Sequence, residues 1–114
     1  MKVSDLQQAA DRATALLKAL AGRNRLMILC QLVEGERSVG ELARLIGARE
    51  TAVSQQLALL RAQGLVSTRR DGQTIYYTLA SPDAAAVIAT LYRLYCAAEQ
   101  PDPSAARGRE VEPA

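Results

Sequence analysis

The sequence contains no histidine, no tryptophan and no phenylalanine, and it has only two cysteines, Cys30 and Cys96. The absence of histidine removes the commonest metal ligand and the usual general base of enzymes. Two isolated thiols do not fill a tetrahedral zinc site within one chain, and the thioredoxin-type Cys-x-x-Cys motif is absent. We therefore expect no catalytic residue, no metal site and no cofactor, and the chain is predicted not to be an enzyme.

Long apolar runs are also missing. No segment approaches the roughly 18 apolar residues of a membrane span, and residues 1–18 lack the profile of a signal peptide. We therefore expect a cytoplasmic protein that contacts no membrane. The formal net charge is only +2 over 114 residues, which argues against a histone-like, purely electrostatic binder of nucleic acid. A chain of this length corresponds to a single domain.

Apolar residues recur at helical spacing in several segments, which predicts a mainly α-helical chain. The expected helices cover residues 6–20, 24–34, 38–47, 50–63 and 81–98. Ser38-Val-Gly-Glu41 has the capping-box pattern, and Ser81 followed by Pro82 is a typical helix start. The side chains expected to face the core are Leu26, Leu29, Cys30 and Val33 in the second helix, and Leu42, Leu45 and Ile46 in the third.

The expected helix 50–63 has two contrasting faces. One face carries Val53, Leu57 and Leu60, and the opposite face and its flanks carry short or amide side chains: Thr51, Gln55, Ala58 and Ala62, with Ser54 and Gln56 beside them. A merely solvated face is more often rich in Glu and Lys. Glutamine can pair bidentately with adenine, and serine can contact several bases. This face therefore predicts contacts with DNA bases.

A short β-hairpin is expected after this helix. Residues 65–70 and 73–79 are rich in strand-forming types, and Asp71-Gly72 between them is a strong hairpin signal. Arg69, Arg70 and Gln73 cluster at the tip, where long side chains can reach the phosphate backbone. Taken singly, either arginine could instead be a solvated charge that blocks pairing at a sheet edge.

Two short helices joined through Gly47 and followed by a basic hairpin describe a winged helix-turn-helix. The first and last helices flank this module and carry more apolar surface than a small domain covers alone. Pairing them across a two-fold axis would bury that surface, which predicts a homodimer bound to palindromic double-stranded operator DNA. We expect residues 4–99 to form this DNA-binding and dimerisation domain, and residues 100–114, which are rich in proline, to form a disordered tail.

Several segments carry a family resemblance. They are Leu20-Ala-Gly-Arg-Asn-Arg-Leu-Met-Ile-Leu29, Ser38-Val-Gly-Glu-Leu42, Val53-Ser-Gln-Gln-Leu57, Leu60-Arg-Ala-Gln-Gly-Leu-Val66 and Arg69-Arg-Asp-Gly-Gln-Thr-Ile-Tyr-Tyr-Thr-Leu79. Together they resemble the ArsR family of bacterial repressors over roughly residues 6–97. The resemblance implies a homodimer through the first and last helices, with DNA contacts from the fourth helix and the wing. The predicted DNA-contacting residues are Arg49, Thr51, Ser54, Gln55, Gln56, Arg69, Arg70 and Gln73.

The sequence departs from the family pattern at three positions. Arg23 stands where the family often has proline at the start of the second helix. Arg49 stands where serine or threonine usually caps the recognition helix, and Gln56 replaces a frequent histidine. The last two departures bear on which bases are read.

The placement of the two cysteines resembles the sulfide- and persulfide-sensing subgroup of the family. The ligand patterns of the metal-sensing branches, a Cys-x-Cys near the third helix or Asp and His on the last helix, are absent. The resemblance implies that Cys30 and Cys96 form a disulfide or a longer polysulfide bridge when a small reactive sulfur species arrives, and that the operator is then released. Burial of Cys30 among apolar neighbours disfavours its ionisation, so we expect Cys96, which follows Arg93 by one turn, to attack first.

Other functions stay open on the sequence alone. The same two thiols could bind a soft metal or metalloid ion, although no third protein ligand is evident. A thiol enzyme would need an activating base and a substrate cleft, and neither is identifiable. A protein-interaction module that has lost DNA binding would keep the fold, and either cysteine alone could be a small buried apolar residue.

Overall fold

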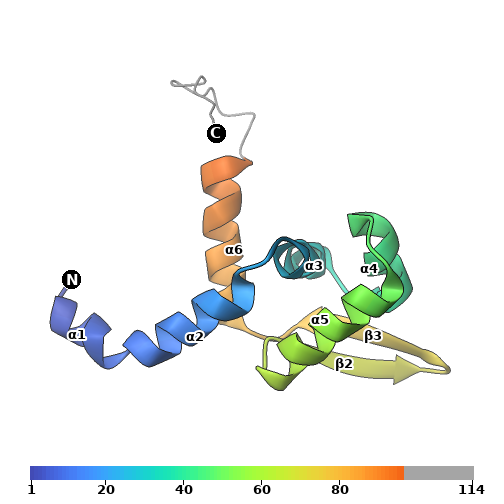
Figure 1. Cartoon of the computed structure of the whole chain (residues 1–114), viewed down its shortest axis with the longest axis horizontal. Coiled ribbons are helices and arrows are strands. Elements are labelled where there is room, and N and C mark those ends of the chain that lie inside the picture. The colour runs from blue at the N-terminus through green and yellow to red at the C-terminus, as the bar shows by residue number, and fades with distance from the viewer. Residues whose placement is uncertain (97–114) are drawn as a thin grey trace.

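The computed structural model describes residues 1–96, in which helices pack against a small three-stranded sheet (Figure 1). The helices are α1 (Val3–Gln8), α2 (Ala10–Leu20), α3 (Arg23–Glu34), α4 (Val39–Ile46), α5 (Glu50–Ala62) and α6 (Pro82–Tyr95). The strands are β1 (Arg37–Ser38), β2 (Val66–Asp71) and β3 (Thr74–Leu79). This order confirms the predicted winged helix-turn-helix. The predicted tail, residues 100–114, and the end of the predicted domain lie outside the described residues.

The core lies where α3, α4 and α5 meet above the sheet. Its largest fully buried side chains are all aliphatic: Ile28, Leu29, Leu42, Val53, Leu57 and Leu60. The prediction for α3 was wrong in part, because the buried side of the helix is rotated slightly from the expected one. Ile28 and Leu32 are buried with Leu29, whereas Val33 is exposed. Leu45, also expected inside, is exposed near the end of α4.

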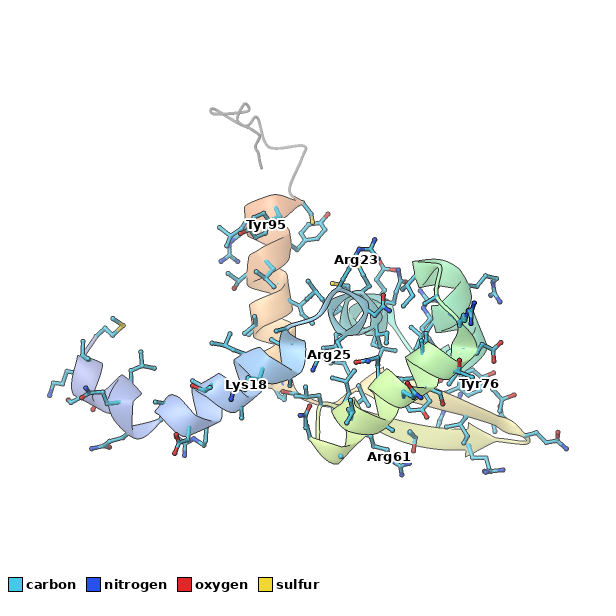
Figure 2. All side chains as sticks on the ribbon, in the orientation of Figure 1. Lys18, Arg23, Arg25, Arg61, Tyr76 and Tyr95 are labelled. Carbon is cyan, nitrogen blue, oxygen red and sulfur yellow. The ribbon has the colours of Figure 1, made fainter. Side chains whose placement is uncertain are left out.

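The N-terminal helix is interrupted, which corrects the single helix expected over residues 6–20. Helix α1 begins at Val3, and the helical conformation breaks at Ala9, whose φ and ψ are −99° and 4°. None of the α1 residues is buried, so packing does not hold the two pieces in one continuous helix. Helix α2 ends at Leu20. Arg25 donates one hydrogen bond of 3.2 Å to the carbonyl oxygen of Lys18 and another to the carbonyl oxygen of Ala21 (Figure 2).

The sheet has one strand more than predicted. Its order is β1-β3-β2, and β1 pairs antiparallel with β3 through Arg37 opposite Tyr77. A strand of only two residues shows no alternation in the sequence, which explains why it was missed. The hairpin turn also lies one residue later than expected, because Asp71 pairs with Thr74 and Gly72, with φ of 65°, occupies the turn.

The predicted helix caps are confirmed. Ser38 accepts a hydrogen bond from the backbone N–H of Glu41, whose carboxylate accepts one from the Ser38 N–H, which completes the capping box. Ser81 accepts from the N–H of Ala84 at the start of α6. That helix ends at Tyr95, earlier than the expected residue 98, and Cys96 caps it. No helix in residues 1–96 is long and apolar enough to cross a membrane.

Two leucines on α5 give a matched test of this packing. Leu57 is fully buried and Leu59 is 53% exposed. Leu57→Ala is expected to lower the free energy of unfolding by about 2–5 kcal/mol, because it leaves a cavity in the core, whereas Leu59→Ala is expected to change it by less than about 0.5 kcal/mol. Urea unfolding followed by circular dichroism measures both. Equal losses for the two variants would contradict the described rotation of α5.

Candidate DNA interface and cysteine pair

Helices α4 and α5 form the helix-turn-helix. Gly47 ends α4 in the left-handed conformation, with φ of 71°, and lets the chain turn sharply. The N–H of Ala48 closes the turn on the carbonyl oxygen of Ala43 at 3.0 Å. Arg49 is the N-cap of α5, but its side chain caps nothing, and it is exposed. It is therefore placed at the start of the recognition helix with its charge open to solvent.

The rotation of α5 follows from its buried residues. Val53, Leu57 and Leu60 lie in the core, as predicted, so the opposite side of the helix is turned outward. The predicted base-contacting residues Thr51, Ser54 and Gln55 are all exposed, and no side-chain hydrogen bond engages them within the described residues. The outer surface of α5 thus presents polar side chains with unused donors and acceptors.

Gln56 differs from its neighbours on α5. It is only half-exposed, and its Oε1 atom is buried with no hydrogen-bond partner among residues 1–96. Arg61, exposed near the end of α5 (Figure 2), was not among the predicted contacts. It lies seven residues after Ser54 and hence on the same side of the helix. Helical spacing alone could have identified it.

The wing is the hairpin of β2 and β3. Arg70 and Gln73 are exposed near its tip, as expected. Arg69 is engaged differently, since its Nε and Nη2 atoms each donate to one oxygen of Glu36 at 2.7 Å. Those hydrogen bonds lower the pKa of Glu36 below the usual carboxylate range. Sequence reasoning missed Glu36, because its proximity to the wing depends on the unpredicted strand β1.

The two cysteines lie on helices that are in contact, Cys30 on α3 and Cys96 at the end of α6. Both are free thiols, with Cys30 half-buried against the core and Cys96 exposed. Burial raises the pKa of Cys30, and the charge of Cys96 raises it further. This direction agrees with the expected resistance of Cys30 to ionisation, and the two thiols lie close enough for their charges to interact.

Comparison with known proteins identifies the module. Residues 22–68 match the family described as bacterial regulatory protein, arsR family. The chain is 46% identical over 100 residues to the transcriptional activator HlyU of Vibrio cholerae, covering 88% of this chain and 93% of that protein. The chain belongs to the ArsR family.

Solved structures of ArsR-family regulators superpose on the chain. The crystal structure of the transcriptional repressor BigR from Xylella fastidiosa has a TM-score of 0.81 at 44% identity, covering 85% of this chain and 99% of that one. The homodimeric winged helix-turn-helix domain Mb0332 from Mycobacterium bovis has a TM-score of 0.67 at 37% identity, covering 79% of this chain and 84% of that one. HlyU and BigR are transcriptional regulators rather than enzymes.

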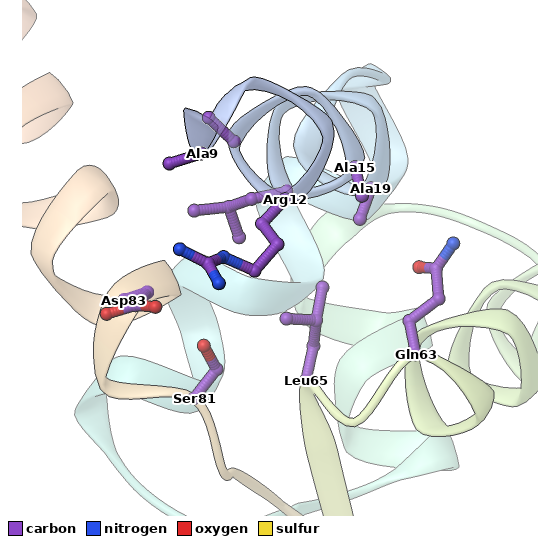
Figure 3. Close-up of a pocket in the computed structure, with 10 residues that line it drawn as sticks. Ala9, Arg12, Ala15, Ala19, Gln63, Leu65, Ser81 and Asp83 are labelled. Atoms are coloured by element: carbon purple, nitrogen blue, oxygen red, sulfur yellow. The ribbon is translucent and has the colours of Figure 1, made fainter. Parts of the chain in front are cut away.

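This ArsR-family chain also exposes apolar side chains on its outer helices. They include Val3, Leu6 and Leu17 on α1 and α2, and Tyr92, Leu94 and Tyr95 on α6. A groove of about 680 Å³ lies between α2 and the start of α6, and its lining consists of Arg12, Asp83, Gln63 and Ser81 together with alanine and leucine side chains (Figure 3). In residues 1–96 no three His, Cys, Asp or Glu side chains gather as metal ligands would.

The nearness of the thiols can be tested through the ionisation of Cys30. Cys96→Ala is expected to lower the pKa of Cys30, because it removes the neighbouring charge, yet to leave that pKa above the value in the unfolded chain, because burial remains. The pH dependence of Cys30 alkylation by iodoacetamide, resolved by peptide mass spectrometry, measures the pKa in both proteins and in urea. The pH midpoint of Cys30 alkylation should be highest in the folded wild-type protein. Superimposable profiles for the folded proteins would refute electrostatic contact between the thiols.

Proposed function

We propose that this chain is a cytoplasmic transcriptional repressor that binds a palindromic operator as a homodimer and releases it when Cys30 and Cys96 become linked. The single observation that supports the proposed DNA binding is the outward face of α5. Burial of Val53, Leu57 and Leu60 leaves Thr51, Ser54 and Gln55 exposed without partners in the described residues. An exposed helix face that carries amide and hydroxyl side chains is suited to reading base edges in the major groove.

Arginine and glutamine side chains around α5 would supply the contacts to phosphates. Arg49 stands at the helix start and Arg70 on the wing, both exposed, and Gln73 lies at the wing tip. Phosphate contacts set the register and orientation of the protein on the duplex, and base contacts set the sequence that is read. We assign Gln55, Thr51 and Ser54 to base edges and these other side chains to the backbone.

The homodimer is supported by the apolar side chains on the flanking helices. Tyr95 on α6 is 80% exposed and Leu17 on α2 is 61% exposed. Figure 1 shows that α6 and the α1–α2 segment both project away from the sheet and the wing. A second copy that covered these surfaces would leave both recognition helices free and relate them by a two-fold axis. Mb0332 of Mycobacterium bovis, a similar protein, is described as homodimeric.

The trigger we propose is a small persulfide, R–S–SH. The Cys96 thiolate attacks its outer sulfur, which gives Cys96–S–SH and releases R–SH. Cys30, deprotonated in turn, attacks the Cys96 sulfur, which forms the disulfide and expels the outer sulfur as hydrogen sulfide. The two thiols are oxidised, and the sulfane sulfur of the persulfide is reduced. Each extra sulfur atom in a longer bridge comes from another persulfide, which leaves as its thiol.

A covalent link between the cysteines would join α6 to α3, and α3 packs against the helix that carries the proposed DNA-binding face. Helix α3 carries Cys30 and packs against α5, while α6 carries Cys96 at its end. A covalent tie favours the helix arrangement in which the sulfurs meet. A coupling free energy of about 1–3 kcal/mol suffices for a 5–150-fold loss of operator affinity.

Base reading by α5 can be tested with two glutamines of the same helix region. Gln55→Ala is expected to weaken binding about 5- to 150-fold per half-site, because a bidentate base contact contributes about 1–3 kcal/mol. Gln63→Ala, at the far end of α5 beside the groove, is expected to leave binding unchanged. Fluorescence anisotropy on the duplex that the wild type enriches from a randomised pool measures both. Indistinguishable affinities for the two variants would rule out the assigned face.

The thiol switch predicts different outcomes for the two cysteine variants. Persulfide should release wild-type protein from the duplex, and Cys30→Ser and Cys96→Ser should both stay bound. Intact mass should show a persulfide on Cys96 in Cys30→Ser and no adduct in Cys96→Ser. An adduct that forms first on Cys30 would reverse the assigned order. Release of all three proteins by arsenite, cadmium or zinc, with no response to persulfide, would favour a metal or metalloid sensor instead.

A further inference from the structure

A bridge of three side chains crosses the outer face of the sheet. Arg69 on β2 donates two hydrogen bonds of 2.7 Å to the carboxylate of Glu36, and its guanidinium lies over the ring of Tyr76 on β3, 4.9 Å from the ring centre. Asp71 adds a weaker contact at 3.9 Å. Two parallel N–H···O bonds and a stacked ring hold the guanidinium in one orientation, which a single surface ion pair does not do.

The bridge joins the wing to the entrance of the helix-turn-helix. Glu36 directly precedes β1, which leads through Ser38 into α4, while Arg69 and Tyr76 are paired residues of the wing hairpin. Because β3 lies between β1 and β2, the Arg69 side chain spans the full width of the sheet. The short β1 strand alone contributes only two paired residues to this connection. The side-chain bridge therefore adds a second tie between the wing and the rest of the domain.

We propose that Glu36 is a positioning residue for DNA binding, acting through Arg69 to orient the wing, and that Arg69 serves this bridge rather than a phosphate. This inference rests on the proposed DNA binding. It predicts that neutralising Glu36 changes DNA affinity in the direction opposite to the one expected from charge alone. A carboxylate near the DNA-binding surface repels phosphates, so its neutralisation should tighten binding if charge alone mattered. If Glu36 orients the wing, its neutralisation weakens binding.

Glu36→Gln provides the test, with Glu34→Gln as the matched control. Glu34 makes only a single 3.5 Å contact with Arg37, and its side chain is 71% exposed, against 29% for Glu36. Both substitutions remove one negative charge from nearly the same place in the chain. Affinity is measured by fluorescence anisotropy over a range of salt concentrations, on the duplex that the wild type enriches from a randomised pool. The swapped variant Glu36→Arg/Arg69→Glu is included, and thermal unfolding of every variant is recorded.

We expect Glu36→Gln to bind about two- to fivefold more weakly per subunit, the range measured for well-formed exposed ion pairs, and Glu34→Gln to bind as tightly as the wild type or tighter. The swap should recover affinity relative to Glu36→Gln, with all melting temperatures nearly equal. Arg69→Gln should lower affinity without reducing the slope of log K against log salt by the one unit that a lost phosphate contact would give.

Three results would overturn the inference. Glu36→Gln could bind as tightly as Glu34→Gln, the swap could fail to recover affinity while remaining folded, or Arg69→Gln could lose a full unit of salt slope. A wild-type protein that enriches no duplex from the pool would instead refute the proposed DNA binding, and the inference with it. The wild-type titration alone therefore distinguishes failure of the positioning role of Glu36 from failure of the proposed DNA binding.

Discussion

Burial of one side of α5 is the constraint on which the rest of the structure depends. Leu57 and Leu60 are fully excluded from solvent, and together with Val53 they anchor α5 against α3 and the sheet. Burying a leucine side chain contributes about 1.5–3 kcal/mol, so rotating the helix away from this position would forfeit several such contributions. The polar side chains opposite therefore cannot turn inward, and the DNA-facing surface is held by the core rather than by its own contacts.

The wing depends on a different kind of interaction. Its tip lies beyond the core, since Ile75 is exposed while Tyr77 and Leu79 further along β3 pack against buried residues. Apolar burial thus fixes the base of the hairpin but not its outer part. There the orientation comes from strand register and from polar contacts such as Arg69 with Glu36. Such contacts are individually weak in water, so the wing is the part of the interface most easily changed by one substitution.

The parts of the structure that could be predicted from sequence are those set by local periodicity. The i, i+4, i+7 spacing of Val53, Leu57 and Leu60 predicted both α5 and its outward face, and the caps at Ser38 and Ser81 were evident from side-chain chemistry. The parts that failed depend on long-range pairing. Strand β1 is too short to carry a pattern, and Glu36 meets Arg69 only because the sheet brings positions 33 residues apart together. The break at Ala9 has no glycine or proline signal.

The same helix, α3, serves the core and the cysteine pair. Leu29 is fully buried and its neighbour Cys30 is half-buried, so a force on the sulfur acts on a segment that packs directly against α5. A direct disulfide requires Cα atoms within about 7 Å, and every added sulfur atom relaxes that requirement. The fewer sulfur atoms the bridge contains, the more closely it holds the exposed end of α6 to α3. Under the proposed switch, bridge length therefore sets how tightly α6 is held to α3, the helix that packs directly against α5.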